Sequence, residues 1–414
     1  MGVIARLAEA KFLDVKRVKA WLAIAAAFTV AAVVAGILLA KDGRDPLGRP
    51  LGTDFLAFWT AARVAIADGA PAVWDGIRLQ AEQVATFGQS DAFTAFFYPP
   101  IFLLIVLPLG LLPHGAALAL WLAGTGLAAA RGLFAQARGT IDARTAILAL
   151  LAFPATFATL GHGQNAFLAT ALFAFAAARL DARPLLAGAL LGALAFKPQL
   201  AVAVPFVLIA GGRLRALAAT VAAALGLAAI ATIAFGVEAW RAFLAMSEVA
   251  RATLDLGLVE AAKMVSPYAA ARVLGASNAT AAALQLAVSI GVLAVVAFAA
   301  RRTSGEATVA LAVAAVPLAG PFVLDYDLMV LAVPMVFLVG EGVRGGFAPH
   351  EKIGLLAAFV LPAAARPLAT MFHLPVAPLV ATVLLALVVR RARSTGRDDA
   401  IRPLLPRESD APSA

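Results

Sequence analysis

The chain has 414 residues, of which 63% are hydrophobic and 14% are charged, and its mean hydropathy is +0.92. Uncharged apolar runs recur along it in a way that soluble proteins do not show, so the sequence predicts an all-α, polytopic membrane protein. The net charge of +9 does not indicate nucleic-acid binding, because Lys and Arg cluster between the apolar runs and near the chain ends, as the positive-inside rule expects. The absence of cysteine excludes disulfides, thiolate chemistry and Cys-ligated metals.

The first membrane helix is predicted over residues 21–40, an uncharged run that follows a basic N-terminal segment. This run is longer than the apolar core of a signal peptide, so we expect a retained helix with a cytoplasmic N-terminus. Residues 41–97 carry seven acidic and five basic side chains and form the first long polar segment. The positive-inside rule places this segment, outer loop 1, on the extracytoplasmic side.

Outer loop 1 contains a short predicted helix that begins with Thr53 as N-cap and carries Asp54 in its first turn. Apolar side chains follow at helical spacing to Ile66, which indicates an amphipathic helix in the membrane interface. A carboxylate near a helix N-terminus is favourable by about 0.3–1 kcal/mol without any function, so helix electrostatics alone is an alternative explanation of Asp54.

The apolar runs after residue 100 are often shorter than a full span and are broken by Pro or Gly, which indicates short or broken helices and about 11–13 membrane segments. The basic turn at 131–144 would face the cytoplasm if residues 101–131 make one net crossing. Residues 236–279 form a second amphipathic extracytoplasmic loop, outer loop 2, with Trp240 and Leu244 on its apolar face. We expect it beside outer loop 1. The predicted transmembrane domain is residues 1–393, and 394–414 is a disordered cytoplasmic tail.

Ionisable groups are costly inside a bilayer, so the few that interrupt the apolar runs carry the most information. On the predicted topology these groups and their polar neighbours lie in the outer half of the membrane. They are Asp54 with Arg63, His162 with Gln164 and Asn165, Lys197 with Gln199, and Asp325, Tyr326 and Asp327. Each has a plain structural alternative: a polar turn for 161–165, an interfacial lysine for Lys197, and a charged helix N-terminus for 325–327.

Several short motifs occur in a fixed order along residues 54–328, and together they resemble glycosyltransferase family 87. The motifs are Asp54-Phe55-x-x-Phe58-Trp59-x-Ala61-Ala62, Phe97-Tyr98-Pro99-Pro100, Gly161-x-Gly163-Gln164-Asn165, Phe196-Lys197-Pro198-Gln199, Ser266-Pro267-Tyr268, and Pro321 through Tyr326-Asp327-Leu328. Members of this family are integral-membrane transferases of the C-type fold that use polyprenyl-phosphate sugars. They include phosphatidylinositol-mannoside mannosyltransferases.

The resemblance implies that a hexose, with mannose favoured, passes from a polyprenyl-phosphate donor to a lipid or glycan acceptor on the outer side. The motifs span residues 54–328, and we expect the transmembrane domain, residues 1–393, to be a single catalytic domain. A single displacement would invert the anomeric carbon, with Asp54 as the base. Lys197, Arg63 and His162 would bind the donor phosphate. The predicted substrate-binding residues are Trp59, Tyr98, Gln164, Asn165, Gln199, Tyr268, Asp325, Tyr326 and Asp327.

No cofactor is predicted, because the sequence shows no convincing metal-ligand cluster; Asp54 with Asp325 or Asp327 would be the acidic pair open to Mg²⁺. The expected partners are the lipid-linked donor, the acceptor and membrane lipids. A composition rich in Ala, Leu and Arg favours a bacterial cell membrane. A transporter or flippase for a lipid-linked sugar would also have broken helices and polar groups at membrane depth, and a noncatalytic scaffold is a third possibility. The absence of an internal repeat and the one-sided polar groups favour the transferase.

Overall fold

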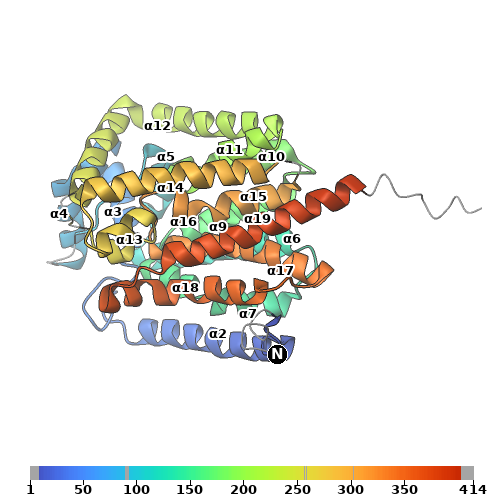
Figure 1. Cartoon of the computed structure of the whole chain (residues 1–414). Coiled ribbons are helices and arrows are strands. Elements are labelled where there is room, and N and C mark those ends of the chain that lie inside the picture. Colours follow the sequence, from blue (N-terminus) through green and yellow to red (C-terminus); the bar gives the residue numbers. More distant parts are fainter. Residues whose placement is uncertain (1–8, 89–92, 256, 258, 302, 402–414) are drawn as a thin grey trace, which may run out of the picture.

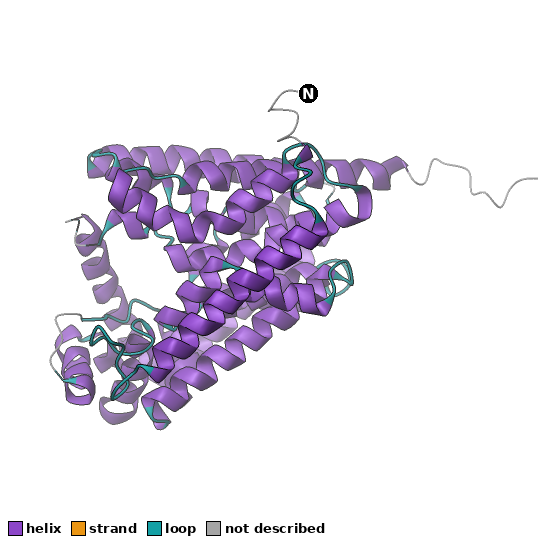
Figure 2. Ribbon diagram, turned by 90° about the horizontal axis from the view of Figure 1, so that it is seen from below, coloured by secondary structure: helices purple, strands orange, loops and turns teal. Residues whose placement is uncertain are grey.

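The computed structural model describes residues 9–88, 93–255, 257, 259–301 and 303–401. These residues are 79% helical and contain no strand, which confirms the predicted all-α class (Figure 2). Six helices among them are long and apolar enough to cross a membrane, so the chain has the fold of a polytopic membrane protein.

The candidate spans differ in length. The long ones are α2 (Val15–Leu38), α6 (His114–Ala137), α12 (Leu214–Asp255), α14 (Asn278–Ala299), η6 (Asp325–Leu331) continued by α17 (Ala332–Gly345), and α18 (Glu351–Phe372). The bent pair α7 (Ala143–Ala152) and α8 (Pro154–His162) turns by 63° at Pro154, as expected for a broken helix. The shorter apolar segments are α5 (Pro100–Val106) with η2 (Leu107–Leu111), α9 (Ala166–Arg179), α10 (Pro184–Gly192) with η3 (Ala193–Phe196), η4 (Pro198–Ala201) with α11 (Val204–Ala210), and α15 (Gly305–Ala314).

The remaining elements connect these segments or end the chain. They are α3 (Phe55–Asp68), η1 (Ala70–Trp74), α4 (Gly76–Phe87), η5 (Ala261–Lys263), α13 (Pro267–Val273), α16 (Val316–Ala319) and α19 (Ala377–Ile401). Helix α19 continues past the start of the predicted disordered tail, and residues 402–414 lie outside the described residues.

The short helices form the centre of the molecule and the long helices surround them (Figure 1). Every residue of α15 is buried, and 78% of the most apolar window of η6–α17 is buried, against 11% for α2 and α12, 17% for α14 and 22% for α18. A long helix that is apolar all round therefore packs on the core with one face and presents the others to lipid. The buried Gln164, Asn165, Lys197 and Asp327 lie in or beside breaks between helical segments, where the exposed backbone is covered by protein.

Helices α10 and α12 approach closely through two glycines one turn apart. A Cβ on Gly188 would lie 2.2 Å from the Ala216 carbonyl oxygen, and a Cβ on Gly192 would lie 2.3 Å from the Thr220 carbonyl oxygen. Such small-residue contacts are typical of membrane helices, which have little hydrophobic driving force to associate in lipid. This contact holds α10, and with it the break at Lys197, against the outer layer.

Outer loop 1 folds back on the core, and the prediction that α3 is amphipathic, with one buried face, is wrong. Phe55 and Ala62 are fully buried, and burial continues round the helix through Phe58 and Thr60. The N-cap is Asp54 rather than Thr53, and its side chain makes no capping hydrogen bond. The apolar spacing predicts one buried face of α3. In the structure α5, η2 and α6 also pack on the other faces of this helix.

Outer loop 2 begins as a continuation of α12, which bends at Gly236, where φ is 78°. Its Phe243 ring lies 6.3 Å from that of Trp74 in outer loop 1, so the two loops lie side by side as predicted. The predicted apolar face is only partly right, because Leu244 is 60% exposed whereas Trp240 and Phe243 are half-buried.

Residues 100–137 contain one helix long enough to cross a membrane, α6, and one net crossing of this region stays a prediction. The short α5 and η2 pack against α3, and α6 alone then passes through the bundle. At its far end Gln136 donates a hydrogen bond of 3.3 Å to Glu306, which follows the basic turn at Arg301. The basic residues near 138 and 301 therefore lie at one end of the molecule, away from outer loop 1 (Figure 1).

Candidate active site

Asp54 is held at the start of α3 by the turn between α8 and α9. Gln164 donates a hydrogen bond of 2.8 Å from Nε2 to Asp54 Oδ2, and the Asp54 backbone N–H donates to the His162 carbonyl at 3.0 Å. The amide of Gln164 has a defined orientation, because its Oε1 accepts from the Tyr98 hydroxyl at 3.3 Å and from the Asn165 N–H at 3.2 Å. The Asp54 side chain is 29% exposed, and among the described residues its second oxygen, Oδ1, accepts only a long hydrogen bond of 3.5 Å from the Thr53 hydroxyl.

His162 lies on the accessible side of this carboxylate. Its Nδ1 is 3.8 Å from Asp54 Oδ1 and 2.8 Å from the Thr53 hydroxyl. The ring also lies 6.0 Å from that of Tyr326, which connects the α8–α9 turn to η6. His162 and Thr53 therefore border the open face of Asp54.

Gly163 makes the close approach of the α8–α9 turn to α3 possible. Its φ of 68° lies in the left-handed region, and a Cβ there would be 2.5 Å from the Cβ of Phe55. The Gly163 carbonyl accepts a hydrogen bond of 3.1 Å from Trp121 Nε1 on α6. A residue with a side chain would not fit at position 163, so the turn needs glycine there. The turn in this position brings the Gln164 side chain to Asp54.

The cationic part of the site is a buried lysine at the break between η3 and η4. Lys197 Nζ donates to Asp327 Oδ1 at 2.6 Å and to Asn165 Oδ1 at 3.2 Å, and the Lys197 and Asp327 side chains are only 4% and 1% exposed. The rings of Tyr326 and Tyr98 lie 5.1 and 6.0 Å from Nζ. This environment explains how a lysine interrupts an apolar run, since a buried charge needs a partner of opposite sign.

These contacts join eight residues in one polar cluster. Its members are Asp54, Tyr98, His162, Gln164, Asn165, Lys197, Tyr326 and Asp327. Asn165 is fully buried, and its Nδ2 lies near the Tyr98 hydroxyl without forming a hydrogen bond of good geometry to any described residue. The cluster therefore combines a partly exposed carboxylate with a buried cation and an unsatisfied buried N–H donor. The adjacent residues Gln164 and Asn165 connect the two parts.

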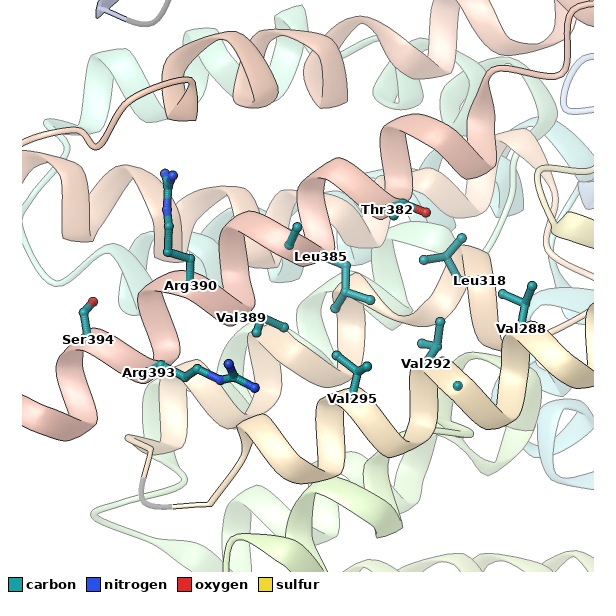
Figure 3. Close-up of a pocket in the computed structure, with 12 residues that line it drawn as sticks. Val288, Val292, Val295, Leu318, Thr382, Leu385, Val389, Arg390, Arg393 and Ser394 are labelled. Carbon is teal, nitrogen blue, oxygen red and sulfur yellow. The ribbon is translucent and has the colours of Figure 1, made fainter.

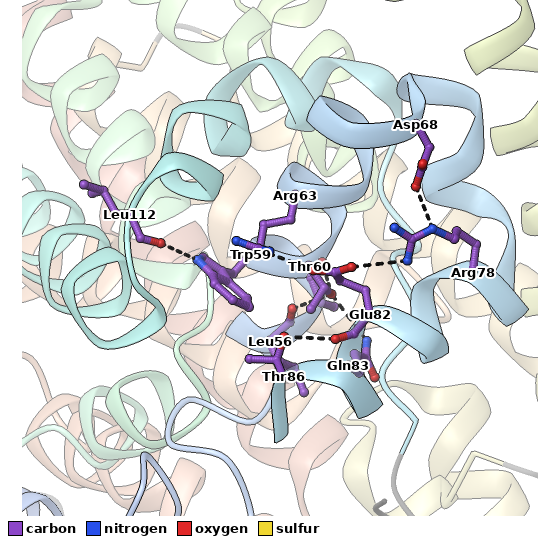
Figure 4. A network of polar contacts seen from close by, with 11 residues as sticks. Leu56, Trp59, Thr60, Arg63, Asp68, Arg78, Glu82, Gln83, Thr86 and Leu112 are labelled. Atoms are coloured by element: carbon purple, nitrogen blue, oxygen red, sulfur yellow. Dashed lines mark hydrogen bonds and ion pairs between the residues drawn. The ribbon is translucent and has the colours of Figure 1, made fainter. Parts of the chain in front are cut away.

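Arg63 and Trp59 are predicted site residues that lie in a different network. Arg63 pairs with Glu82 at 2.7 Å, and its guanidinium lies 5.0 Å from the Trp59 ring (Figure 4). Trp59 is buried and donates to the Leu112 carbonyl at 2.9 Å. Arg78 extends the network, donating to Asp68 at 2.6 Å and to Glu82 at 3.2 Å. The structure shows these residues joining α3 to α4 and η2 and brings neither of them into the polar cluster.

The Ser266-Pro267-Tyr268 motif supports the cluster from outside it. Ser266 donates to the Pro321 carbonyl at 2.6 Å, and the Val265 N–H donates to the Val323 carbonyl at 2.9 Å. Tyr268 is buried in a separate apolar group, with its hydroxyl 3.4 Å from Asn278 Oδ1. The motif thus fixes the segment that leads into η6. Gln199 is half-buried in η4, and among the described residues its side chain makes no hydrogen bond with the cluster.

Asp325 lies at the edge of the cluster and is linked to a residue that the sequence analysis did not select. Its Oδ1 accepts from the Tyr326 N–H at 2.8 Å, and its Oδ2 is 3.9 Å from Arg366 on α18. Arg366 also lies 3.5 Å from Glu260 in outer loop 2. An arginine inside an otherwise apolar run was a signal available in the sequence. Thr53 is a second missed residue, because it was assigned only a capping role.

The acidic side chains of the site are each held by other groups. Gln164 bonds Asp54, Lys197 bonds Asp327, and the Tyr326 N–H bonds Asp325. In the described part of the chain, no group of three or more His, Asp or Glu side chains could hold a metal ion. Metal independence stays a prediction.

The fold and the cluster together define a multi-pass membrane protein with polar chemistry concentrated beside two loops at one end of its helices. The model of glycosyltransferase family 87 matches residues 96–324, more than half of the chain. The chain belongs to glycosyltransferase family 87 and is a membrane glycosyltransferase. No curated protein and no solved structure gives a significant match. The matched range contains Tyr98, the 161–165 motif and Lys197, whereas Asp54 and Asp327 lie outside it.

Proposed function

We propose that this glycosyltransferase moves a hexose, with mannose favoured, from a polyprenyl-phosphate donor to a lipid or glycan acceptor on the extracytoplasmic side of a bacterial cell membrane. The observation that carries the proposal is the polar cluster, which offers an accessible carboxylate and a buried cation from adjacent parts of one site. Mannose is favoured by the resemblance of the ordered motifs to phosphatidylinositol-mannoside mannosyltransferases. The outer side is favoured by the acidic excess of outer loop 1.

The proposed reaction is a single displacement at the anomeric carbon. The acceptor hydroxyl oxygen forms a bond to that carbon while the bond from carbon to the phosphate oxygen breaks, so the configuration inverts. Asp54 accepts the hydroxyl proton and later releases it to water. The polyprenyl phosphate leaves with one more negative charge than it had in the donor, so it needs cationic stabilisation more than a general acid.

Lys197 and Asn165 are the proposed stabilisers of that charge. An ammonium has three N–H donors, and Asp327 and Asn165 accept two of those of Lys197, which leaves one for a phosphate oxygen. The Nδ2 of Asn165 is a second donor that lacks a well-formed hydrogen bond. A donor phosphate there would satisfy it, and the low dielectric of the site would strengthen both contacts. His162, beside Asp54, is placed to contact the sugar or the phosphate.

Sugar transfer in detergent solution tests the proposal, because a transporter forms no glycosidic bond and needs two compartments. Purified protein would be incubated with radiolabelled polyprenyl-phosphate mannose and a lipid and glycan extract from a strain lacking the gene, and products would be identified by mass spectrometry. We expect a mannosylated product that is missing from the deletion strain. An unchanged lipid and glycan profile in that strain, together with no transfer in vitro from mannose or other hexose donors, would reject the proposed donor.

A further inference from the structure

An apolar groove lies between α14 and α19, away from the polar cluster (Figure 3). Its volume is about 980 Å³, and its walls are valines and leucines of the two helices with Leu318 of α16 at one end. Gly291 contributes no side chain, and a Cβ there would meet nothing within 4 Å. The groove runs along α19 from Thr382 to Ser394, which is about 18 Å at the rise of an α-helix and close to the ~15 Å of one leaflet.

One end of the groove is strongly basic. Arg390, Arg393 and Ser394 line this end, and the Arg393 guanidinium lies 5.1 Å from the Phe298 ring of α14. The guanidinium of Arg301 lies 5.3 Å from the same ring. Among the side chains that the structure describes, which exclude those of 395–400, no carboxylate pairs with Arg393 or Arg301. Two like charges at one ring favour an anion between or beside them.

The nearby carboxylate of Glu351 does not neutralise this end. Glu351 is fully buried and is bonded by Arg391 through two guanidinium nitrogens, one of them at 2.6 Å. Arg390 lies farther from it, at 3.9 Å, and donates to the Pro349 carbonyl at 3.1 Å. Glu351 is therefore bonded by Arg391 and lies near Arg390, so it is not a partner of Arg393 or Arg301.

We infer that the groove binds an anionic phospholipid, with its phosphate at Arg393, whose guanidinium faces α14, and an acyl chain along Gly291 toward Leu318 (Figure 3). The arrangement has the polarity of a lipid, because a basic end is followed by an apolar channel about one leaflet long. Basic pockets between membrane helices are known binding sites for anionic headgroups. The inference does not depend on the proposed sugar chemistry, because none of these residues belongs to the polar cluster.

Native mass spectrometry of the full chain in detergent tests the site, with dioleoyl phosphatidylglycerol and dioleoyl phosphatidylcholine as probes. Phosphatidylglycerol should bind wild type at least about fivefold more tightly than phosphatidylcholine. One basic side chain lowers the Kd for an anionic headgroup by about this factor. Arg393→Gln should weaken phosphatidylglycerol binding about fivefold and leave phosphatidylcholine binding unchanged. Gly291→Phe should abolish saturable binding of phosphatidylglycerol by filling the groove.

Gly226→Phe on α12 is the matched control, because Gly226 is also exposed and a Cβ there also meets nothing within 4 Å. It should bind phosphatidylglycerol as wild type does. Equal binding of the two lipids by wild type, or wild-type binding by Gly291→Phe, would overturn the inference. Displacement of the bound lipid by inorganic phosphate alone would also overturn it, because it would indicate an ion site. A dimer that Gly291→Phe dissociates would overturn it too, because it would indicate a self-association surface.

Discussion

Replacing Lys197 by Met separates the structural role of the buried ion pair from its proposed role in donor binding. The Asp327 carboxylate is only 1% exposed. Without Lys197 it keeps one hydrogen bond, which it accepts from the Leu324 N–H at 3.2 Å. Breaking a buried pair from one side costs about 3–5 kcal/mol, because the other charge stays buried and uncompensated. The Lys197→Met variant should therefore unfold at a much lower temperature than wild type, by tryptophan fluorescence in detergent.

The double variant Lys197→Met/Asp327→Leu removes both charges and should recover most of this stability, to within about 1–2 kcal/mol of wild type, since an apolar pair of similar volume can replace a buried ion pair. Its donor binding should nevertheless stay impaired. A hydrogen bond from a charged group contributes about 1.5–3 kcal/mol, so the apparent KM for the polyprenyl-phosphate donor should rise about 10- to 150-fold.

The exposed Lys19–Asp142 pair, at 3.0 Å, supplies a control, and Lys19→Met should change neither stability nor KM appreciably. A double variant that is stable and keeps the wild-type KM for donor would refute the role of Lys197 in phosphate binding. A double variant as unstable as the single one would refute the argument that the unpaired carboxylate is the source of the loss.

Three further changes test other parts of the account. Gly163→Val should lower the unfolding temperature and sugar transfer together, because the left-handed φ costs about 1–2 kcal/mol and the new Cβ would press on Phe55; unchanged transfer would show that the turn can move freely. Arg366→Gln should leave stability within about 1 kcal/mol but alter donor KM through Asp325, and an unchanged KM would restrict Arg366 to a surface role. Cysteine at exposed Ala81 should react with an impermeant maleimide in intact cells, whereas labelling only after lysis would reverse the proposed orientation.

The polar residues of the cluster could be selected from sequence because each interrupts an apolar segment at a cost. Lys197 interrupts an apolar run, and the structure supplies a buried anion for it, Asp327, from a segment 130 positions away. Gln164 and Asn165 are predicted substrate-binding residues with a polar turn as the alternative, and the structure shows both a turn at Gly163 and a hydrogen bond from Gln164 to Asp54. The partners themselves could not be predicted, because hydropathy and local spacing carry no information on contacts between distant segments.

Packing of a helix on several sides could not be predicted from the sequence. Helix α3 has apolar spacing compatible with one buried face, yet short neighbouring segments cover nearly all of it. Arg63 was grouped with Asp54 through proximity in sequence, but nine helical residues place their Cα atoms about 13 Å apart along the axis. Glu82 of α4 then provides a nearer partner for Arg63. Tyr268 was assigned through its motif, whose contacts instead fix the approach to η6.

The central claim is that the Asp54 carboxylate is the base for the acceptor hydroxyl, and the transfer rate of purified Asp54→Asn tests it most directly. Asp75→Asn is the matched control, since Asp75 also begins a helix in outer loop 1 and Asn preserves its cap. Loss of a general base should reduce kcat by about 100- to 10,000-fold in Asp54→Asn, with folding and donor KM retained and Asp75→Asn fully active. A folded Asp54→Asn enzyme that transfers sugar at the wild-type rate would contradict the account.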